Sequence, residues 1–273
     1  MSRKLFCELG PWAYWLSSAK CRVTRRISDA LSRDEFAAKR SEEPLPVLIY
    51  RHNSLILRRL GQVDMTLQEN KAVNLALAAP HVSGVLLRPG ETLSFWQLVG
   101  NPSARRGYRK GLTVGNGATG QGVGGGMCQF TNLLHWLALH SDLTITEHHH
   151  HDGYDLFPDF GRQVPFGVGT SIVYNYLDYR LRNDTVRTYQ LLTWVDGEYL
   201  RGELRADLPQ GVKYHLHAEN ERFVQEDGVV YRLGQVWREA VDPATGNVTA
   251  RGLLRENHAR VMYDTAELLI EKV

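Results

Sequence analysis

Cysteine, net charge and long apolar runs are all scarce in this sequence of 273 residues. Three cysteines are few and odd in number, which excludes a disulfide framework and favours a reducing compartment. A formal net charge of +2 is too small to indicate nucleic acid or an anionic membrane as a partner. A transmembrane helix needs a run of about eighteen apolar residues, and because the sequence has none we expect no membrane span.

The opening segment, residues 1–28, combines a basic start with aromatic residues but lacks the pattern of a signal peptide. Glu8 and Pro11 interrupt the apolar core that such a peptide needs, and basic residues follow closely. We therefore predict an amphipathic opening segment in a cytoplasmic protein. Trp12, Tyr14 and Trp15 are candidates for peripheral contact with a membrane surface, but packing against the core is the preferred expectation.

Reactive residue types are concentrated between Gly111 and His151. A glycine-dense loop leads to Cys128. A helical run follows, and then a short β-prone segment that ends in four consecutive histidines. Apolar residues recur at helical spacing from about residue 128 to 140, which predicts an amphipathic helix with Cys128 in its first turn. Free backbone N–H groups and the helix dipole favour a thiolate there, and the thiolate is the reactive form. The bland alternative is a small buried cysteine.

The glycines just before Cys128 fit a loop that binds an oxyanion. Gly124, Gly125 and Gly126 let main-chain N–H groups approach a ligand closely. A phosphate-binding P-loop is not indicated, because no Gly-Lys-Ser/Thr follows. A flexible turn is the simpler alternative.

A thiol nucleophile needs a base, and the histidine tract is the better source of one. His135 lies about 10 Å of axial rise along the same helix from Cys128, so direct contact is not expected. On an extended chain Glu147, His149 and His151 share one face. One of these imidazoles is therefore the expected base, and Glu147 the group that orients it. Solvated histidines at a strand end are the alternative interpretation.

A zinc site is a weaker alternative at the same residues. Zinc takes Cys and His ligands, and the spacing of His149 and His151 suits one ion. The sequence has no C-x-x-C and no H-x-x-x-H on a helix, which are the specific zinc-binding spacings. We therefore predict no metal and no other cofactor.

Several motifs together resemble the VanW family. PGETLSFWQLVG at 89–100 is followed by Gly107-Tyr108, by GVGGGMCQ at 122–129 and by EHHHH at 147–151. DYRLRNDT at 178–185 resembles the closing strand segment of the family. The resemblance covers about residues 65 to 195, and the combination is far more specific than any single motif.

The resemblance implies glycopeptide resistance as the context and a peptidoglycan stem peptide or precursor as the partner. It also implies the chemistry of a cysteine-dependent L,D-transpeptidase, with Cys128 as nucleophile and His151 or His149 as general base. The residues that would bind the substrate are Gly124, Gly125, Gly126, Gln129, Glu91 and Tyr108. Two alternatives stay open: a non-catalytic protein that binds a peptide or carboxylate, and a zinc-dependent hydrolase.

The sequence predicts an α+β fold in three parts. Residues 1–64 form an N-terminal segment, 65–195 a VanW-like domain, and 196–273 a β-rich C-terminal portion packed on it. In the central part, the helix that follows the glycine-rich loop is expected to pack on a mainly antiparallel sheet.

Further elements are predicted around that helix. Met65 to Ala79 reads as a second helix that Pro80 is expected to end. Strand signals predict three antiparallel strands at 166–176, 179–182 and 188–195.

Overall fold

The computed structural model describes residues 5–58, 64–115, 118–150, 153–159, 163–174 and 176–272, so His151 lies outside the described residues. The helices are η1 Phe6–Glu8, α1 Pro11–Leu31, α2 Met65–Val82, α3 Phe95–Val99, η2 Ala104–Arg106 and α4 Met127–Leu139. The strands are β1 Glu35–Phe36, β2 Val47–Leu55, β3 Val85–Leu87, β4 Glu91–Ser94, β5 Lys110–Gly115, β6 Ala118–Val123, β7 Thr144–Glu147, β8 Tyr154–Asp155, β9 Arg180–Arg182, β10 Tyr189–Asp196, β11 Tyr199–Ala206, β12 Lys213–Glu226, β13 Val229–Val241, β14 Val248–Val261 and β15 Ile270–Lys272. These elements confirm the predicted α+β class.

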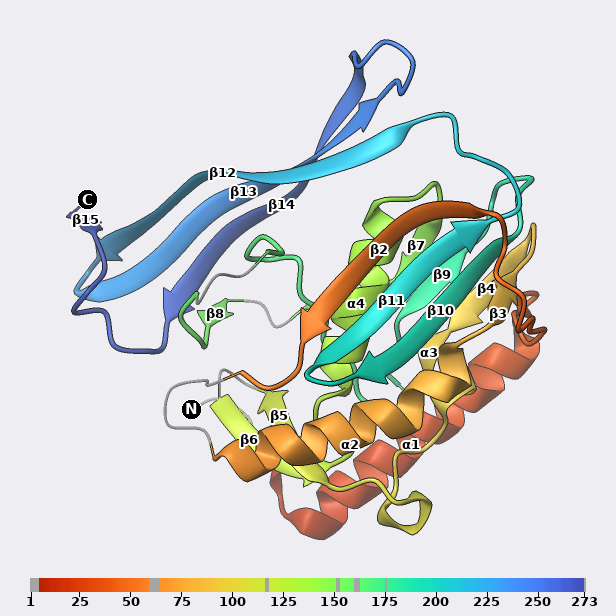
Figure 1. The fold of residues 1–273 in the computed structure, drawn as a ribbon. Coiled ribbons are helices and arrows are strands. Elements are labelled where there is room, and N and C mark those ends of the chain that lie inside the picture. Colours follow the sequence, from red (N-terminus) through yellow and green to blue (C-terminus); the bar gives the residue numbers. More distant parts are fainter. Residues whose placement is uncertain are drawn as a thin grey trace.

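The central layer is the antiparallel sheet β2-β11-β10-β3, and α4 packs across one of its faces (Figure 1). Strands from all three predicted parts of the chain meet in this sheet. α4 matches the predicted helix and places Phe130, Leu133 and Leu137 in the core. Gly202 on β11 lets the helix come close, because an added Cβ would lie 2.9 Å from the Leu133 side chain. The predicted packing of this helix on an antiparallel sheet is confirmed.

α2 packs on the same sheet and continues past the predicted end at Pro80 to Val82. The prediction is wrong because Pro80 lies in the last turn, where a missing backbone N–H costs one helical hydrogen bond at most. The carbonyl groups of that turn have a partner outside the helix. Arg40 donates to the Pro80 carbonyl at 2.6 Å and to the His81 carbonyl.

A second sheet, in the order β1-β4-β9-β7, places the histidine tract next to the first family motif. β7 ends at Glu147, directly before the histidines, and pairs antiparallel with β9. β9 pairs in turn with β4, which begins at Glu91. The motifs around Glu91 and Glu147 therefore lie two strands apart, although they are far apart in the sequence.

Residues 168–174, here called the strap, cross α4 as an irregular segment, and the strand predicted at 166–176 is wrong. Its backbone forms a hydrogen bond with a side chain of α4, whereas a strand would form backbone hydrogen bonds with a neighbouring strand. The Thr170 N–H donates to Asn132 Oδ1 on α4 at 2.6 Å. Two apolar residues of the strap, Val168 and Ile172, are buried, whereas Val173 is 36% exposed. The alternation in the sequence therefore reflects packing on a helix.

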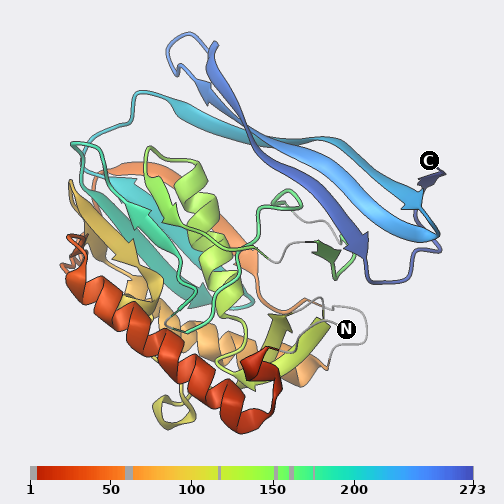
Figure 2. The ribbon, with the colours of Figure 1, turned by 180° about the vertical axis from the view of Figure 1, so that it is seen from behind.

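The C-terminal portion is a long antiparallel sheet of β12, β13 and β14, here called the wing, which extends away from the body (Figures 1 and 2). The wing meets the body beside α4, where Val236 joins a buried cluster with Trp136 and Leu139. Arg238, which packs on the Tyr214 ring within the wing, donates to the Ser141 carbonyl of the body at 2.5 Å and so joins the two parts. The predicted β-rich C-terminal portion is confirmed.

α1 is a helix of 21 residues on the outside of the body, on the opposite side from the wing (Figures 1 and 2). Trp12, Tyr14 and Trp15 are 62%, 59% and 65% exposed, so the expectation that they pack against the core is wrong. The reason is that α1 attaches through charged residues, with Arg25 and Asp29 in ion pairs to the body. None of the helices in the described ranges is both long and apolar enough to cross a bilayer.

Candidate functional site

The turn before α4 consists of glycines because the chain is crowded there. Gly126 caps the helix at φ 102°, a left-handed conformation that favours glycine. An added Cβ on Gly125 would lie 2.3 Å from the backbone of Gly111, so the turn and β5 are in direct contact. Asn74 on α2 donates to the Gly125 carbonyl at 2.9 Å. The conformation and the crowding of the turn therefore require glycine at these positions, apart from the binding role that the sequence predicts.

Cys128 lies in the first turn of α4, as the sequence predicts, and is half-buried. Burial raises the pKa of its thiol, although backbone N–H groups of Ile172 and of Cys128 itself act in the other direction. The expectation that the helix start depresses this pKa is therefore wrong for the structure as it stands. Desolvation of the charged sulfur outweighs the hydrogen bonds that would stabilise it.

The strap covers the face of α4 that carries Cys128, and Thr170 is the centre of its contacts. The Thr170 hydroxyl lies 2.5 Å from the Thr131 hydroxyl and 2.8 Å from Asn132 Oδ1. It also lies 3.3 Å from the Cys128 carbonyl. Ile172, whose N–H reaches the sulfur, is two residues further along the same segment. The strap therefore limits access to the thiol.

Glu147 and His149 are brought together on one side of the histidine tract. His149 Nε2 lies 3.0 Å from the Glu147 carboxylate. Arg25 and the backbone N–H of Asp178 donate to the same carboxylate. Burial works to raise the pKa of Glu147, but the hydrogen bonds outweigh it and hold the pKa below its usual value. Glu147 is therefore anionic at neutral pH and fixes one ring nitrogen of His149.

His148 lies on the other side of the tract and stacks on His135 of α4, with the ring centroids 4.1 Å apart. His150 approaches His148 edge-on at the same centroid distance, 4.1 Å. His135 Nδ1 lies 3.1 Å from the Tyr179 hydroxyl. Burial, with the neighbouring His148 and His150, holds the pKa of His135 well below its ordinary value. His135 is therefore neutral and joins the polar face of α4 to the histidine tract.

The other predicted substrate-binding residues contact neighbouring parts of the chain. Glu91 is buried, and its carboxylate accepts hydrogen bonds from the Arg88 backbone at 2.8 Å and side chain at 2.9 Å. Gln129 donates to the Ser54 hydroxyl on β2 at 2.8 Å, so it points toward the sheet. Tyr108 is buried in the core. Gln129 thus ties α4 to β2, and Glu91 closes the turn that leads into β4, roles that the sequence did not indicate.

Lys71 also lies in this region, although the sequence did not single it out as a candidate residue. It is buried on α2, and its side chain passes so close to Gly126 that an added Cβ there would lie 2.2 Å from Lys71 Cγ. Burial, with the charge of Arg58, lowers the pKa of Lys71 to about 7. The signal was a lysine within the apolar stripe of a predicted helix, four residues before the buried Leu75.

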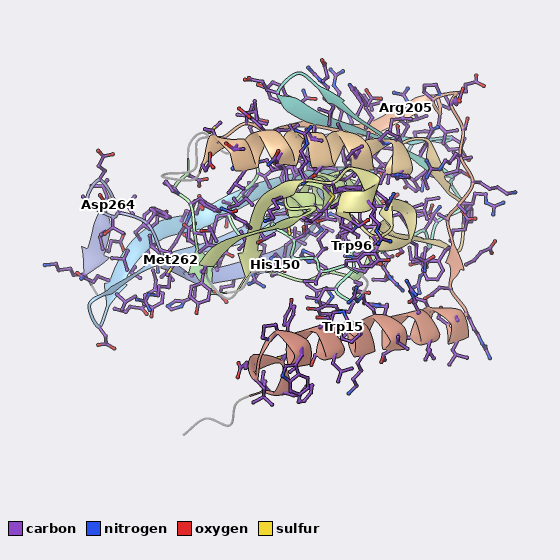
Figure 3. The ribbon with its side chains drawn as sticks, turned by 90° about the horizontal axis from the view of Figure 1, so that it is seen from below. Trp15, Trp96, His150, Arg205, Met262 and Asp264 are labelled. Atoms are coloured by element: carbon purple, nitrogen blue, oxygen red, sulfur yellow. The ribbon has the colours of Figure 1, made fainter. Side chains whose placement is uncertain are left out.

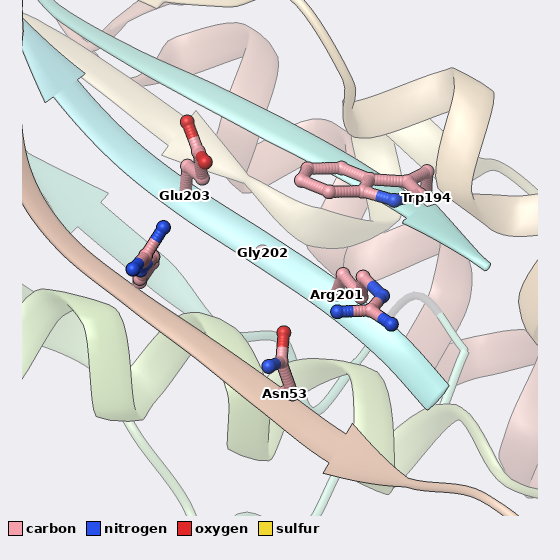
Figure 4. Close-up of a pocket in the computed structure, with 6 residues that line it drawn as sticks. Asn53, Trp194, Arg201, Gly202 and Glu203 are labelled. Atoms are coloured by element: carbon pink, nitrogen blue, oxygen red, sulfur yellow. The ribbon is translucent and has the colours of Figure 1, made fainter. Parts of the chain in front are cut away.

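A shallow polar pocket lies on the face of the central sheet opposite α4 (Figure 4). Arg201 and Glu203 point to this face because side chains alternate along β11 and Gly202 faces the helix. Trp194 on β10 and Asn53 on β2 flank Arg201 from either side. The pocket lies across the sheet from Cys128, and none of the predicted site residues lines it.

Metal binding has no support in the part of the chain that the structure describes. No three His, Cys, Asp or Glu side chains there are grouped as a metal ion requires. His151, one of the two histidines considered for zinc, lies outside the described ranges.

The site therefore consists of a glycine turn, a cysteine in the first turn of the helix that follows, and a histidine tract after that helix. Comparison with known proteins identifies the family that has this arrangement. A family profile described as "VanW like protein" matches residues 70–205. The "Vancomycin B-type resistance protein VanW" of Enterococcus faecalis is 36% identical over 267 residues, which cover 98% of this chain and 97% of that protein. The chain belongs to the VanW family.

A second relative matches a smaller part. The "Uncharacterized protein YoaR" of Bacillus subtilis is 27% identical over 118 residues, which cover 42% of this chain and 36% of that protein. No solved structure matches this chain.

Proposed function

We propose that this protein contributes to glycopeptide resistance by acting on a peptidoglycan stem peptide or precursor. The support is its similarity, over nearly the whole length of both chains, to a relative whose name states vancomycin resistance. The activity that we infer is acyl transfer through Cys128.

In this reaction the Cys128 thiol gives its proton to an imidazole, His149 or His151. The sulfur attacks a peptide carbonyl of the substrate, a C–S bond forms and the C–N bond breaks. The departing amine takes up the proton from the imidazole, and a thioester remains on Cys128. A second amine, or water, then attacks the thioester carbonyl, the C–S bond breaks and the thiol regains a proton.

The observation that carries this proposal is the position of the sulfur at the start of α4. The N–H groups of Cys128 and Ile172 are directed at it. N–H groups at a helix start stabilise negative charge, on a thiolate or on the oxygen of a tetrahedral intermediate. The crowded turn of Gly124, Gly125 and Gly126 holds this helix start in place.

The strap has to move before such a reaction begins. Desolvation is the main cause of the raised pKa of Cys128, so water or substrate that reaches the sulfur would lower the pKa. The N–H of Cys128 itself and the helix start would remain. A peptide that displaces Thr170 from Thr131 and Asn132 would therefore uncover and activate the thiol in one step.

Alkylation by iodoacetamide tests the proposal in a Cys7→Ser/Cys21→Ser background, in which Cys128 is the remaining thiol. Thr170→Ala removes the hydroxyl that joins the strap to α4, and we expect labelling at neutral pH to be about tenfold faster. Thr249→Ala on the wing is the matched control, because its hydroxyl also bonds a backbone carbonyl, and labelling should not change.

Two further variants address the base. His149→Ala and His151→Ala each remove one candidate imidazole, and loss of one of them should slow the labelling of Cys128. If Cys128 reacts no faster than a free thiol in the Thr170→Ala variant, and neither histidine matters, acyl transfer at Cys128 is wrong.

The second candidate is a non-catalytic protein that binds a peptide or a carboxylate on the same surface. The raised pKa of Cys128 and the strap over it favour this candidate. The Cys128→Ser variant separates the two. Binding of a synthetic stem peptide, measured by calorimetry, should persist in the variant in both cases, but release of an amine stops only if Cys128 is the nucleophile.

A further inference from the structure

α1 is held to the body through a polar face. Arg25 donates to the Glu147 carboxylate and, at 2.9 Å, to the Tyr176 carbonyl. One turn further on, Asp29 accepts two hydrogen bonds from Arg180, each of 2.8 Å. A helix on the surface of a protein normally buries its apolar face, so the opposite arrangement in α1 needs an explanation.

The outward side of α1 carries a continuous apolar stripe. Trp12, Leu16, Val23 and Ile27 lie within about 60° of one another at 3.6 residues per turn. Their exposed fractions are 62%, 47%, 54% and 54%. Figure 3 shows the body on one side of α1 and open space on the other. A contiguous exposed apolar surface, unlike scattered apolar residues, marks a site of interaction.

The charges around the stripe favour an anionic partner. Lys20 and Arg26 are exposed beside it. α1 contains one acidic residue, Asp29, and Arg180 pairs with it on the docked side. A second copy of α1 on the stripe would bring like charges together, whereas anionic lipid head groups would attract them. Trp15 adds an aromatic ring of the kind that settles at a membrane interface.

We propose that α1 lies along the surface of an anionic phospholipid bilayer, with the stripe among the acyl chains and Lys20 and Arg26 at the phosphates. The net charge of +2 gives no sign of this, because it sums over the whole chain. Since Arg25 binds Glu147, such docking places the histidine tract about 10 Å, one helix diameter, from the lipid surface. The inference does not rest on the proposed reaction at Cys128.

Co-sedimentation of the full chain with vesicles tests the proposal. Vesicles of phosphatidylcholine and phosphatidylglycerol should bind the protein about tenfold more tightly than phosphatidylcholine alone. Val23→Ser/Ile27→Ser should weaken binding to the anionic vesicles by about tenfold, because it shortens the apolar stripe. Val248→Ser/Leu253→Ser on the wing removes side chains of similar exposure, 53% and 46%, and should leave binding unchanged.

The contribution of charge has its own pair of variants. Lys20→Glu/Arg26→Glu should abolish binding to anionic vesicles, whereas Arg105→Glu/Arg109→Glu, an equal change of net charge at exposed residues elsewhere, should retain it. Equal losses in the two variants, or no binding by the unaltered chain, would overturn the proposal. So would a dimer in analytical ultracentrifugation that Val23→Ser/Ile27→Ser abolishes, in a chain that does not bind vesicles.

Discussion

α4 and α1 are both amphipathic helices, but they are oriented in opposite ways. α4 buries its apolar face against the central sheet, and its polar face, with Cys128, lies under the strap. α1 turns its polar face to the body through Arg25 and Asp29, and its apolar stripe faces outward. The difference teaches that helical periodicity defines two faces and does not decide which of them meets the protein.

The largest expected difference between the two helices is in stability. Leu137→Ala removes a fully buried side chain of α4 and should lower the free energy of unfolding by about 4 kcal/mol. Ile27→Ala removes a side chain of α1 that is more than half exposed, and should change it by about 0.5 kcal/mol or less. Urea denaturation of both variants measures this. Similar losses would show that α1 packs its stripe against the body after all.

The helix starts offer a second contrast, because each helix has a glycine N-cap with positive φ, Gly126 in α4 and Gly10 in α1. A Cβ on Gly126 would collide with Lys71, whereas one on Gly10 meets its nearest neighbour at 3.7 Å. We therefore expect Gly126→Ala to cost about 3 kcal/mol and Gly10→Ala about 1 kcal/mol. Equal costs in thermal unfolding would mean that the turn before α4 is less crowded than the structure shows.

A smaller effect on the free energy of unfolding is expected when the ion pair between Arg25 of α1 and Glu147 is removed. The pKa of Glu147 lies below its usual 4.5, so its ion pairs stabilise the fold above pH 4.5 and lose this effect as the pH falls through the lowered value. Glu147→Gln should cost about 1 kcal/mol near neutral pH, and less as the pH falls below 4.5. Hydrogen exchange of the α1 amides should quicken in the same variant.

Glu203→Gln is the control for this attachment. Glu203 pairs with Arg205 at 2.8 Å within β11, far from α1 in the fold, so its loss should leave the exchange of α1 unchanged. If both variants loosen α1 alike, the ion pair with Arg25 does not hold the helix.

Local patterns carried much of the fold. The spacing of Phe130, Leu133 and Leu137 predicted α4 because apolar burial repeats with the helix period. The prediction that Pro80 ends α2 was wrong, because the effect of a proline on a helix depends on partners such as Arg40 that are distant in sequence. The prediction of a strand at 166–176 was wrong for a related reason. Apolar and polar residues alternate in the same way whether Val168 and its neighbours pack on a strand or on a helix.

The candidate site was predictable in its parts and less so in its chemistry. The sequence placed Cys128 at the start of a helix, but the direction of its pKa depends on a covering segment some forty residues away in the chain. The burial of Lys71 beside Gly126 depends on the packing of α2 against the glycine turn. Long-range contacts of this kind leave little trace in a single sequence.

The most direct test is intact-protein mass spectrometry of the chain incubated with a synthetic peptidoglycan stem peptide. We expect a covalent acyl adduct on Cys128, more abundant in the Thr170→Ala variant and lost in Cys128→Ser. No adduct on Cys128 in either the unaltered chain or Thr170→Ala, with the peptide shown to bind, would contradict a nucleophile beneath the strap and leave a binding protein.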